Sequence, residues 1–198
     1  MTDPVASGTQ TGRDARRTLA DQYHASLAML GQAIRHCPDD LWTDAAYPNK
    51  FWHVAYHTLF FAHFYLQEDE ASFVPWEHHR QEYESLGPLP WPPHQMPNIG
   101  DPYTRDEVLD YWAVCDAMVD SALSQMDLEA PDSGFWWYKV SKLDHQLINI
   151  RHIQHHAGQL ADRLRTKAGI GVDWVGGRPA DSPAEWSRAG EAKAARRT

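Results

Sequence analysis

Histidine is the residue type whose number and spacing in this chain point to chemistry. Seven of the 12 histidines lie in two short windows, residues 53–63 and 145–156. The windows contain His53, His57 and His63, and then His145, His152, His155 and His156. Histidine is the commonest protein ligand of transition metals, because a neutral imidazole offers a nitrogen lone pair near neutral pH. Two such clusters indicate a candidate metal site.

Each window contains two histidines four residues apart, which is the spacing of neighbours on one helix face. His152 and His156 form such a pair, and so do His53 and His57. Side chains at this spacing lie about 6 Å apart, so either pair can chelate one ion. Zinc needs at least three protein ligands, and a catalytic site leaves the fourth position open. The third imidazole must therefore come from the other window, and spacing alone does not decide which window supplies the pair.

The first two helices follow from the periodicity of apolar residues. From Leu19 to Cys37 these residues recur every three or four positions, which predicts a helix that ends at Pro38. A second, strongly aromatic helix follows Pro48, with Asn49 as its predicted N-cap. This second helix carries the first histidine window.

Two further helices have their own start signals. Thr104 and Glu107 have the spacing of a capping box, which predicts the start of the third helix. The fourth helix is predicted to begin at Ser141 and end at Gly169, and it carries the second histidine window. No alternating strand pattern and no internal repeat occurs in the sequence. The sequence therefore predicts an all-α fold, a four-helix bundle.

A long connection, residues 67–103, separates the second predicted helix from the third. It contains seven of the 13 prolines, which exclude a long helix but leave room for a short one over residues 77–86. Trp76 and Trp91 indicate that the connection packs onto the helices. Together with the Trp-Trp-Tyr run at 136–138, they could form the wall of an apolar substrate pocket; the alternative is ordinary packing over the end of the bundle.

Composition divides the chain into three parts. Residues 1–13 are small and polar, which predicts a disordered leader. Residues 14–176 form the predicted bundle domain. Residues 177–198 are rich in Gly, Ala and charge, which predicts a flexible tail.

Charge and hydropathy exclude several classes of protein. Lys and Arg total 18 against 27 Asp and Glu, a net charge of −9, which opposes binding to nucleic acid. No segment approaches the roughly 18 apolar residues that a membrane span needs, and the first residues lack the apolar stretch of a signal peptide. Cys37 and Cys115 both lie on apolar stripes, so we expect them in the core. These features predict a cytoplasmic protein without nucleic-acid or membrane partners.

Three segments carry a resemblance to a known family. They read FWHVAYHTLFFAHFYL (51–66), NIRHIQHHAGQLADRLR (149–165) and GIGVDWVG (169–176). Together they are similar to the DinB/YfiT-like superfamily of metal-dependent enzymes, whose last-helix motif His-x-x-x-His-x-Gly-Gln-Leu matches residues 152–160. The resemblance covers residues 14–176 and implies a four-helix bundle.

The resemblance also implies which histidines bind the metal. It assigns His57 from the second helix, and His152 and His156 from the last, as ligands of a divalent ion, zinc or nickel. On the residues alone, His53 or His63 could take the place of His57. The remaining histidines would then have structural roles, with Gln159 as a hydrogen-bonding neighbour of the ligands.

The chemistry implied by the resemblance is that of an activated thiol or water. Members of the superfamily include thiol-dependent transferases and isomerases that use bacillithiol, mycothiol or glutathione. An ion held by three neutral imidazoles keeps its full charge and lowers the pKa of a bound water or thiol. The resemblance therefore implies a metal-dependent thiol transferase or hydrolase that acts on a small-molecule substrate with a low-molecular-weight thiol.

Two alternatives to an enzyme stay open, and the general base is not identified. The first is a bundle that binds a metal or a small ligand without catalysis, and the second is a structural homodimer. Spacing does not name a general base, although Asp116, Asp120 and Asp144 are candidates for orienting a ligating imidazole.

Overall fold

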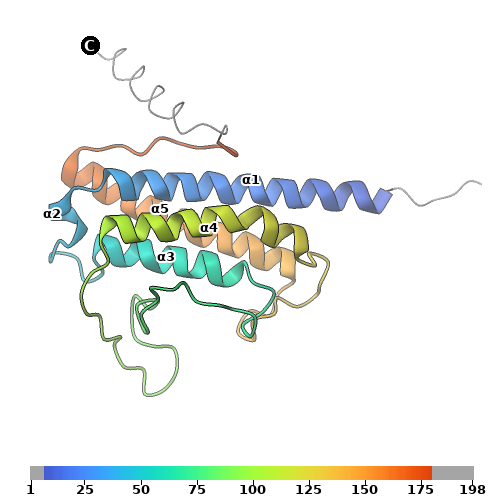
Figure 1. The fold of residues 1–198 in the computed structure, drawn as a ribbon, viewed down its shortest axis with the longest axis horizontal. Coiled ribbons are helices and arrows are strands. Elements are labelled where there is room, and N and C mark those ends of the chain that lie inside the picture. The colour runs from blue at the N-terminus through green and yellow to red at the C-terminus, as the bar shows by residue number, and fades with distance from the viewer. Residues whose placement is uncertain (1–6, 180–198) are drawn as a thin grey trace, which may run out of the picture.

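The computed structural model describes residues 7–179, and these form helices and the segments that connect them. The helices are α1 (Ser7–His36), α2 (Asp39–Trp42), α3 (Phe51–Tyr65), α4 (Arg105–Gln125) and α5 (Lys142–Ala168). No strand occurs between residues 7 and 179, so the predicted all-α class is confirmed. The four long helices lie side by side, and the short α2 lies at one end of them (Figure 1).

The long helices pack in a regular set of pairs. α1 lies against α4 and α5, and α3 lies against the same two helices. α3 and α5 run antiparallel: the backbone carbonyl of Ala62 accepts a hydrogen bond from Asn149, and that of Tyr65 accepts one from Gln146, three residues earlier in α5. The seam between α3 and α5 therefore brings the two histidine windows together.

Helix α3 is buried on nearly all sides. Thirteen of its 15 residues are buried, and only His57 and Phe61 are partly exposed. These two residues are four apart, so they lie on one face and mark the stripe of α3 that reaches the surface. A polar side chain elsewhere on this helix must find a hydrogen-bond partner inside the protein, because an unpaired buried polar group is costly.

Several predicted helix ends are confirmed and one is wrong. Thr104 and Glu107 form the predicted capping box at the start of α4, and Gly169 ends α5 in the left-handed conformation at φ 68°. The predicted N-cap Asn49 is wrong, because α3 begins one residue later, after Lys50. The Asn49 amide donates instead to the carbonyl of Leu86 in the long connection.

The connection over residues 67–103 contains turns and no helix, so the room left for a short helix over residues 77–86 is not used. Glu82 has a φ of 72°, which a continuous right-handed helix cannot accommodate. The carbonyls of Tyr83 and Glu84 accept hydrogen bonds from histidines of α3. In a continuing helix, such carbonyls would accept hydrogen bonds from backbone N–H groups of the same helix. The connection is thus held against α3 by tertiary contacts.

Helix α1 begins within the segment expected to be a leader. α1 begins at Ser7, so residues 7–13 are helical and only residues 1–6 of the expected leader lie outside the described residues. Extending a helix that already exists costs less than starting one, which is why a helix can continue into a small, polar segment.

The segment that follows α5 is attached to α1 and α4 by ion pairs. Beyond Gly169 the chain runs back along α1 (Figure 1), and Arg178 forms ion pairs with Asp21 of α1 and Asp120 of α4. The first residues of the predicted tail therefore contact the helices. Its remainder, residues 180–198, lies outside the described part of the chain.

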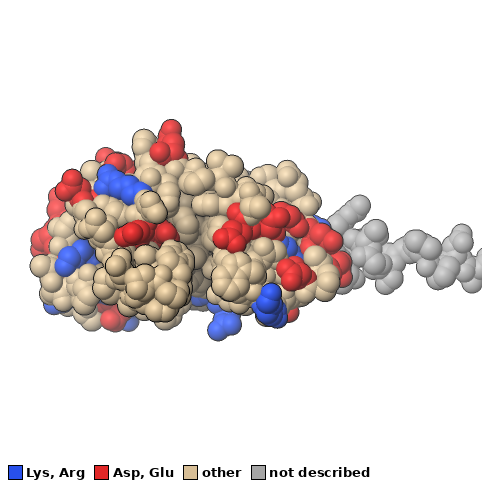
Figure 2. Space-filling view, turned by 90° about the horizontal axis from the view of Figure 1, so that it is seen from below, with Lys and Arg blue, Asp and Glu red and all other residues tan. Residues whose placement is uncertain are grey.

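The surface carries charges of both signs. Figure 2 shows the face on the side of α3 and the long connection, where acidic and basic side chains are separated by broad areas with neither. No continuous basic patch is seen on this face. Within residues 7–179, no helix is both long enough and apolar enough to cross a membrane.

Candidate metal centre

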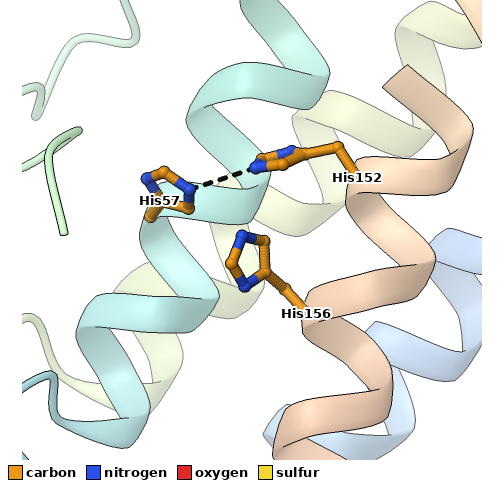
Figure 3. Close-up of side chains that lie close together, drawn as sticks. All are labelled: His57, His152 and His156. Atoms are coloured by element: carbon orange, nitrogen blue, oxygen red, sulfur yellow. Dashed lines mark hydrogen bonds between the residues drawn. The ribbon is translucent and has the colours of Figure 1, made fainter. Parts of the chain in front are cut away.

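Three histidines from two helices meet at the seam between α3 and α5. His57 projects from α3 toward His152 and His156, which lie one turn apart on α5 (Figure 3). One ring nitrogen from each of the three lies within 4.8 Å of the other two. The structure therefore selects His57 as the partner of the His152 and His156 pair.

The distances between the rings suit a shared ion. The Nε2 atoms of His57 and His152 are 3.1 Å apart. Two nitrogens bound to one tetrahedral zinc at about 2.0–2.1 Å each would lie about 3.3 Å from one another. The ring of His156 lies 4.8 Å from that of His57 and 4.6 Å from that of His152, measured between centroids. Small side-chain adjustments would bring all three nitrogens to bonding distance.

The hydrogen bonds at the outer nitrogens leave the inner nitrogens of two ligands unprotonated. The Nδ1 atom of His57 lies 2.5 Å from the backbone carbonyl oxygen of Glu84, and a carbonyl can only accept. The proton of neutral His57 is therefore on Nδ1, and Nε2 carries the lone pair. The Nδ1 atom of His156 donates in the same way to the Oε1 atom of Gln159, at 2.8 Å. Outer hydrogen bonds of this kind orient metal-binding imidazoles in known metal sites.

Burial keeps all three imidazoles neutral. Desolvation is the main cause of the lowered pKa of each, and it brings the pKa of His152 to about 3. The neighbouring imidazoles lower the pKa of His57 and His152 further, because a second positive charge at this distance would be repelled. A neutral imidazole is the form that binds metal. The site thus needs no proton release from these rings near neutral pH.

The centre lies at the edge of the core, where it is shielded and still reachable. His156 is buried, whereas His57 and His152 are partly exposed. The ring of Phe61, one turn after His57, packs against both of these partly exposed imidazoles. A small molecule can therefore approach from the side of α3 that reaches the surface.

The other histidines of the two windows are engaged elsewhere. His53 contacts the carbonyl of Tyr83 at 2.9 Å, and His63 contacts the hydroxyl of Tyr111 at 3.1 Å. Neither belongs to the cluster of ligand atoms, so the alternatives to His57 are not supported by the geometry. His155 is exposed and contacts Gln159.

His145 has an unusual position for a histidine. Its side chain is fully buried among the rings of Tyr65, Phe135 and Tyr138, with centroids 4.6–5.0 Å away. Neither ring nitrogen has a hydrogen-bond partner within the described residues. This histidine packs as part of the core and does not reach the centre.

None of the three aspartates considered for the centre lies beside its histidines. Asp144 interacts with the hydroxyl of Ser141 at the start of α5. Asp116 and Asp120 pair with His24 of α1, and so serve the contact between α1 and α4. The outer partner of His57 is instead a backbone carbonyl, which leaves no side-chain signal in a sequence.

The two cysteines are structural, as expected. Cys37 and Cys115 are both buried and not paired with each other. Desolvation raises the pKa of Cys37 to about 12 and raises that of Cys115 as well, so neither thiol ionises near neutral pH. A nucleophilic role would need a thiolate.

A cavity of about 330 Å³ lies at the start of α3, next to the long connection. Its walls include Asn49, Lys50, Trp52, His53, Leu86 and Ile99. His53 is one helical turn from His57, so the cavity lies on the same helix as the centre.

The aromatic residues expected to form a pocket wall do not line this cavity. Trp76 is buried and stacks on Tyr111, with ring centroids 4.5 Å apart, whereas Trp91 and Trp136 are largely exposed. Trp137 stacks on a phenylalanine of α3, and Tyr138 packs against His145. Packing, the alternative considered for these residues, describes Trp76, Trp137 and Tyr138 better.

Comparisons with known proteins returned no match: no family model, no curated protein and no solved structure is similar to this chain. The candidate centre is therefore defined by its own geometry, three neutral imidazoles from two antiparallel helices.

Proposed function

We propose that this protein is a metal-dependent enzyme of the DinB/YfiT-like superfamily, built as a four-helix bundle of α1, α3, α4 and α5. In this proposal His57, His152 and His156 bind one divalent ion, zinc or nickel. The observation that carries it is the convergence of three ligand nitrogens within 4.8 Å of one another. The packing of the four long helices and the match of residues 152–160 to the superfamily motif support it further.

The chemistry follows from the ligand set. A divalent ion held by three neutral imidazoles keeps its charge and lowers the pKa of a water or thiol beside it. The chain contributes the orientation: the Glu84 carbonyl holds His57, and Gln159 holds His156. The ring of Phe61 packs against His57 and His152 and adds apolar surface beside the centre. Three protein ligands leave one side of a tetrahedral site for a reactant.

The proposed reaction joins a low-molecular-weight thiol to a small electrophilic substrate, or hydrolyses that substrate. The cavity beside His53, about 330 Å³, falls in the range of about 300–1,000 Å³ typical of small-molecule sites. Its wall includes Trp52 and Leu86, which are apolar, and Lys50, whose ammonium group donates to the carbonyl of Tyr47. We propose this cavity as the place where part of the substrate binds.

Metal analysis of protein purified without a histidine tag tests the proposal. We expect about one equivalent of zinc or nickel in the parent chain and less than about a tenth of an equivalent in His57→Ala, His152→Ala and His156→Ala. His155→Ala is the matched control: it removes an exposed imidazole next to His156, and its metal content should equal that of the parent. The proposed site is contradicted if His155→Ala also loses its metal, or if the parent chain contains no metal.

Activity assays then separate the two reaction types. The loaded protein is incubated with an electrophile, with and without glutathione, bacillithiol or mycothiol. Consumption that depends on the thiol supports a transferase, and consumption without thiol supports a hydrolase. One equivalent of metal without either activity would favour the non-catalytic metal-binding bundle, and a chain without metal would favour the structural homodimer.

A further inference from the structure

Two buried polar atoms beside the centre lack hydrogen-bond partners. They are the Oδ1 atom of Asn149 and the Nδ1 atom of His152, and no group in the described part of the chain is bonded to either. Asn149 is completely buried, and the Nδ1 atom of His152 is buried although its ring is partly exposed. Buried polar atoms without protein partners are commonly satisfied by an ordered internal water, which needs at least two polar neighbours.

The spacing of the two residues along α5 allows one water to serve both atoms. Asn149 and His152 are three residues apart on α5, so they share a helix face with Cβ atoms about 5–6 Å apart. A water with hydrogen bonds of about 2.8 Å on either side spans up to about 5.6 Å. The Asn149 amide is oriented by its Nδ2 atom, which donates to the carbonyl of Ala62. The Asn149 side chain also contacts the Tyr23 hydroxyl, and Oδ1 has no hydrogen-bond partner among the described residues.

The positions of the protons show why a water fits better than a direct contact. Without metal, the 3.1 Å contact between the Nε2 atoms of His57 and His152 requires one proton. His57 keeps its proton on Nδ1, bonded to the Glu84 carbonyl, so the proton of the contact belongs to Nε2 of His152. The Nδ1 atom of His152 is then a lone-pair acceptor. The Asn149 oxygen is also an acceptor, and two acceptors cannot bond directly.

Metal binding would reverse the state of His152. Its Nε2 atom must offer a lone pair to the ion, so the single proton of the neutral ring moves to Nδ1. One proton leaves Nε2 and one arrives at Nδ1, so the ring stays neutral and gains no proton overall. A water can donate to Nδ1 in the first state and accept from Nδ1–H in the second, while it donates to Asn149 in both.

We propose that one buried water bridges Asn149 and His152, and that Asn149 is a positioning residue which holds His152 in either tautomer through this water. The metal-dependent part of this inference rests on the proposed function. The bridge is the outer hydrogen bond of His152, and it corresponds to the Glu84 carbonyl for His57 and to Gln159 for His156. Each ligand of the centre would then have its own outer partner, as metal-binding imidazoles generally do.

Asn149→Leu tests the positioning role, because leucine fills a similar volume and cannot hold the water. Gln146→Met is the matched control. It removes an equally buried amide three residues earlier, whose partners are Tyr23 and the carbonyl of Tyr65. Zinc affinity is measured by competition with a chelator. We expect Asn149→Leu to bind zinc about 10- to 100-fold more weakly and Gln146→Met to stay within about threefold of the parent. Equal affinities in the two variants would overturn the positioning role.

The unsubstituted protein gives a second test that does not depend on variants or activity. Nitrogen NMR of histidine-labelled, metal-free protein should show His152 protonated on Nε2, and added zinc should move the proton to Nδ1. A crystal structure of the metal-free protein should show a water within about 3.2 Å of both Asn149 Oδ1 and His152 Nδ1. A metal-free His152 protonated on Nδ1, or no water at this place, overturns the inference.

The two proposals fail in different ways. If the parent protein takes up no zinc, the proposed function is contradicted, and the metal-free tautomer and water still decide the bridge. If the parent binds zinc and the water is missing, the metal centre stands and the role of Asn149 is rejected.

Discussion

In each candidate ligand, one ring nitrogen faces away from the centre. A hydrogen bond at this outer nitrogen holds the imidazole in its orientation. His57 is held by a backbone carbonyl, which no side-chain substitution removes directly. His156 is held by the side chain of Gln159, which also donates to His155. Gln159 thus links two neighbouring histidines, and only one of them belongs to the centre.

We predict that Gln159→Leu weakens zinc binding by about tenfold, because His156 loses the acceptor that fixes its proton on Nδ1. The dissociation constant is measured by chelator competition. His155→Ala serves as the control, since it removes the other partner of Gln159 and leaves the bond to His156 in place. An unchanged dissociation constant in Gln159→Leu would show that His156 is held by packing alone.

At the scale of helices, the close packing of α1 on α4 stabilises the fold. The indole of Trp112 in α4 lies across Gly31 of α1 and donates to the carbonyl of Leu27 at 2.7 Å. The guanidinium of Arg35 lies over the same ring, 4.5 Å from its centroid. A side chain at position 31 would place its Cβ atom 2.9 Å from the indole. The absence of a side chain at Gly31 is therefore what allows this contact.

Gly31→Ala should lower the free energy of unfolding by about 1–3 kcal/mol, because the pinned indole must move. This loss opposes the gain of up to about 1 kcal/mol that alanine brings to a helix interior. Gly158→Ala in α5 is the control: a Cβ atom there meets nothing within 4 Å, so the same exchange should stabilise the protein by about 0.5–1 kcal/mol. Urea unfolding measures both, and a gain in stability from Gly31→Ala would contradict the packing argument.

At the scale of the whole molecule, buried histidines make stability depend on pH. Desolvation lowers the pKa of His63 and of His145 from 6.5 to about 4 in each case. Below pH 6.5 these two histidines bind protons in the unfolded chain but stay neutral in the folded protein. The free energy of unfolding therefore falls as the pH decreases. The pKa of His24 is raised instead, chiefly by its hydrogen bond to Asp116, and this group opposes the trend.

We predict that the metal-free protein loses stability between pH 6.5 and about pH 4, with His145 contributing on the order of 3 kcal/mol at most. His145→Met tests the assignment. Methionine suits the aromatic surroundings, and no hydrogen bond to a described residue is lost. Denaturant unfolding at pH 7 and pH 4.5 should show a smaller difference for the variant than for the parent. An equal difference would mean that His145 does not resist protonation.

Local signals in the sequence were sufficient for much of the fold. The capping box of Thr104 and Glu107, the start at Ser141 and the glycine at 169 each act within a few residues, and each is confirmed. The pairing of His152 with His156 is local in the same sense, because helix geometry alone places them on one face. Interactions between residues at most four apart can be read without knowing what the rest of the chain does.

The composition of the centre was decided only by the tertiary structure. Spacing left His53, His57 and His63 as candidates, and the resemblance favoured His57. The choice depends on how α3 is rotated against α5, and on the connection whose carbonyls engage His53 and His57. The same contacts explain why Asn49 is not a cap and why residues 77–86 form no helix. Such contacts join residues that are distant in sequence, so they follow from packing and leave no local pattern.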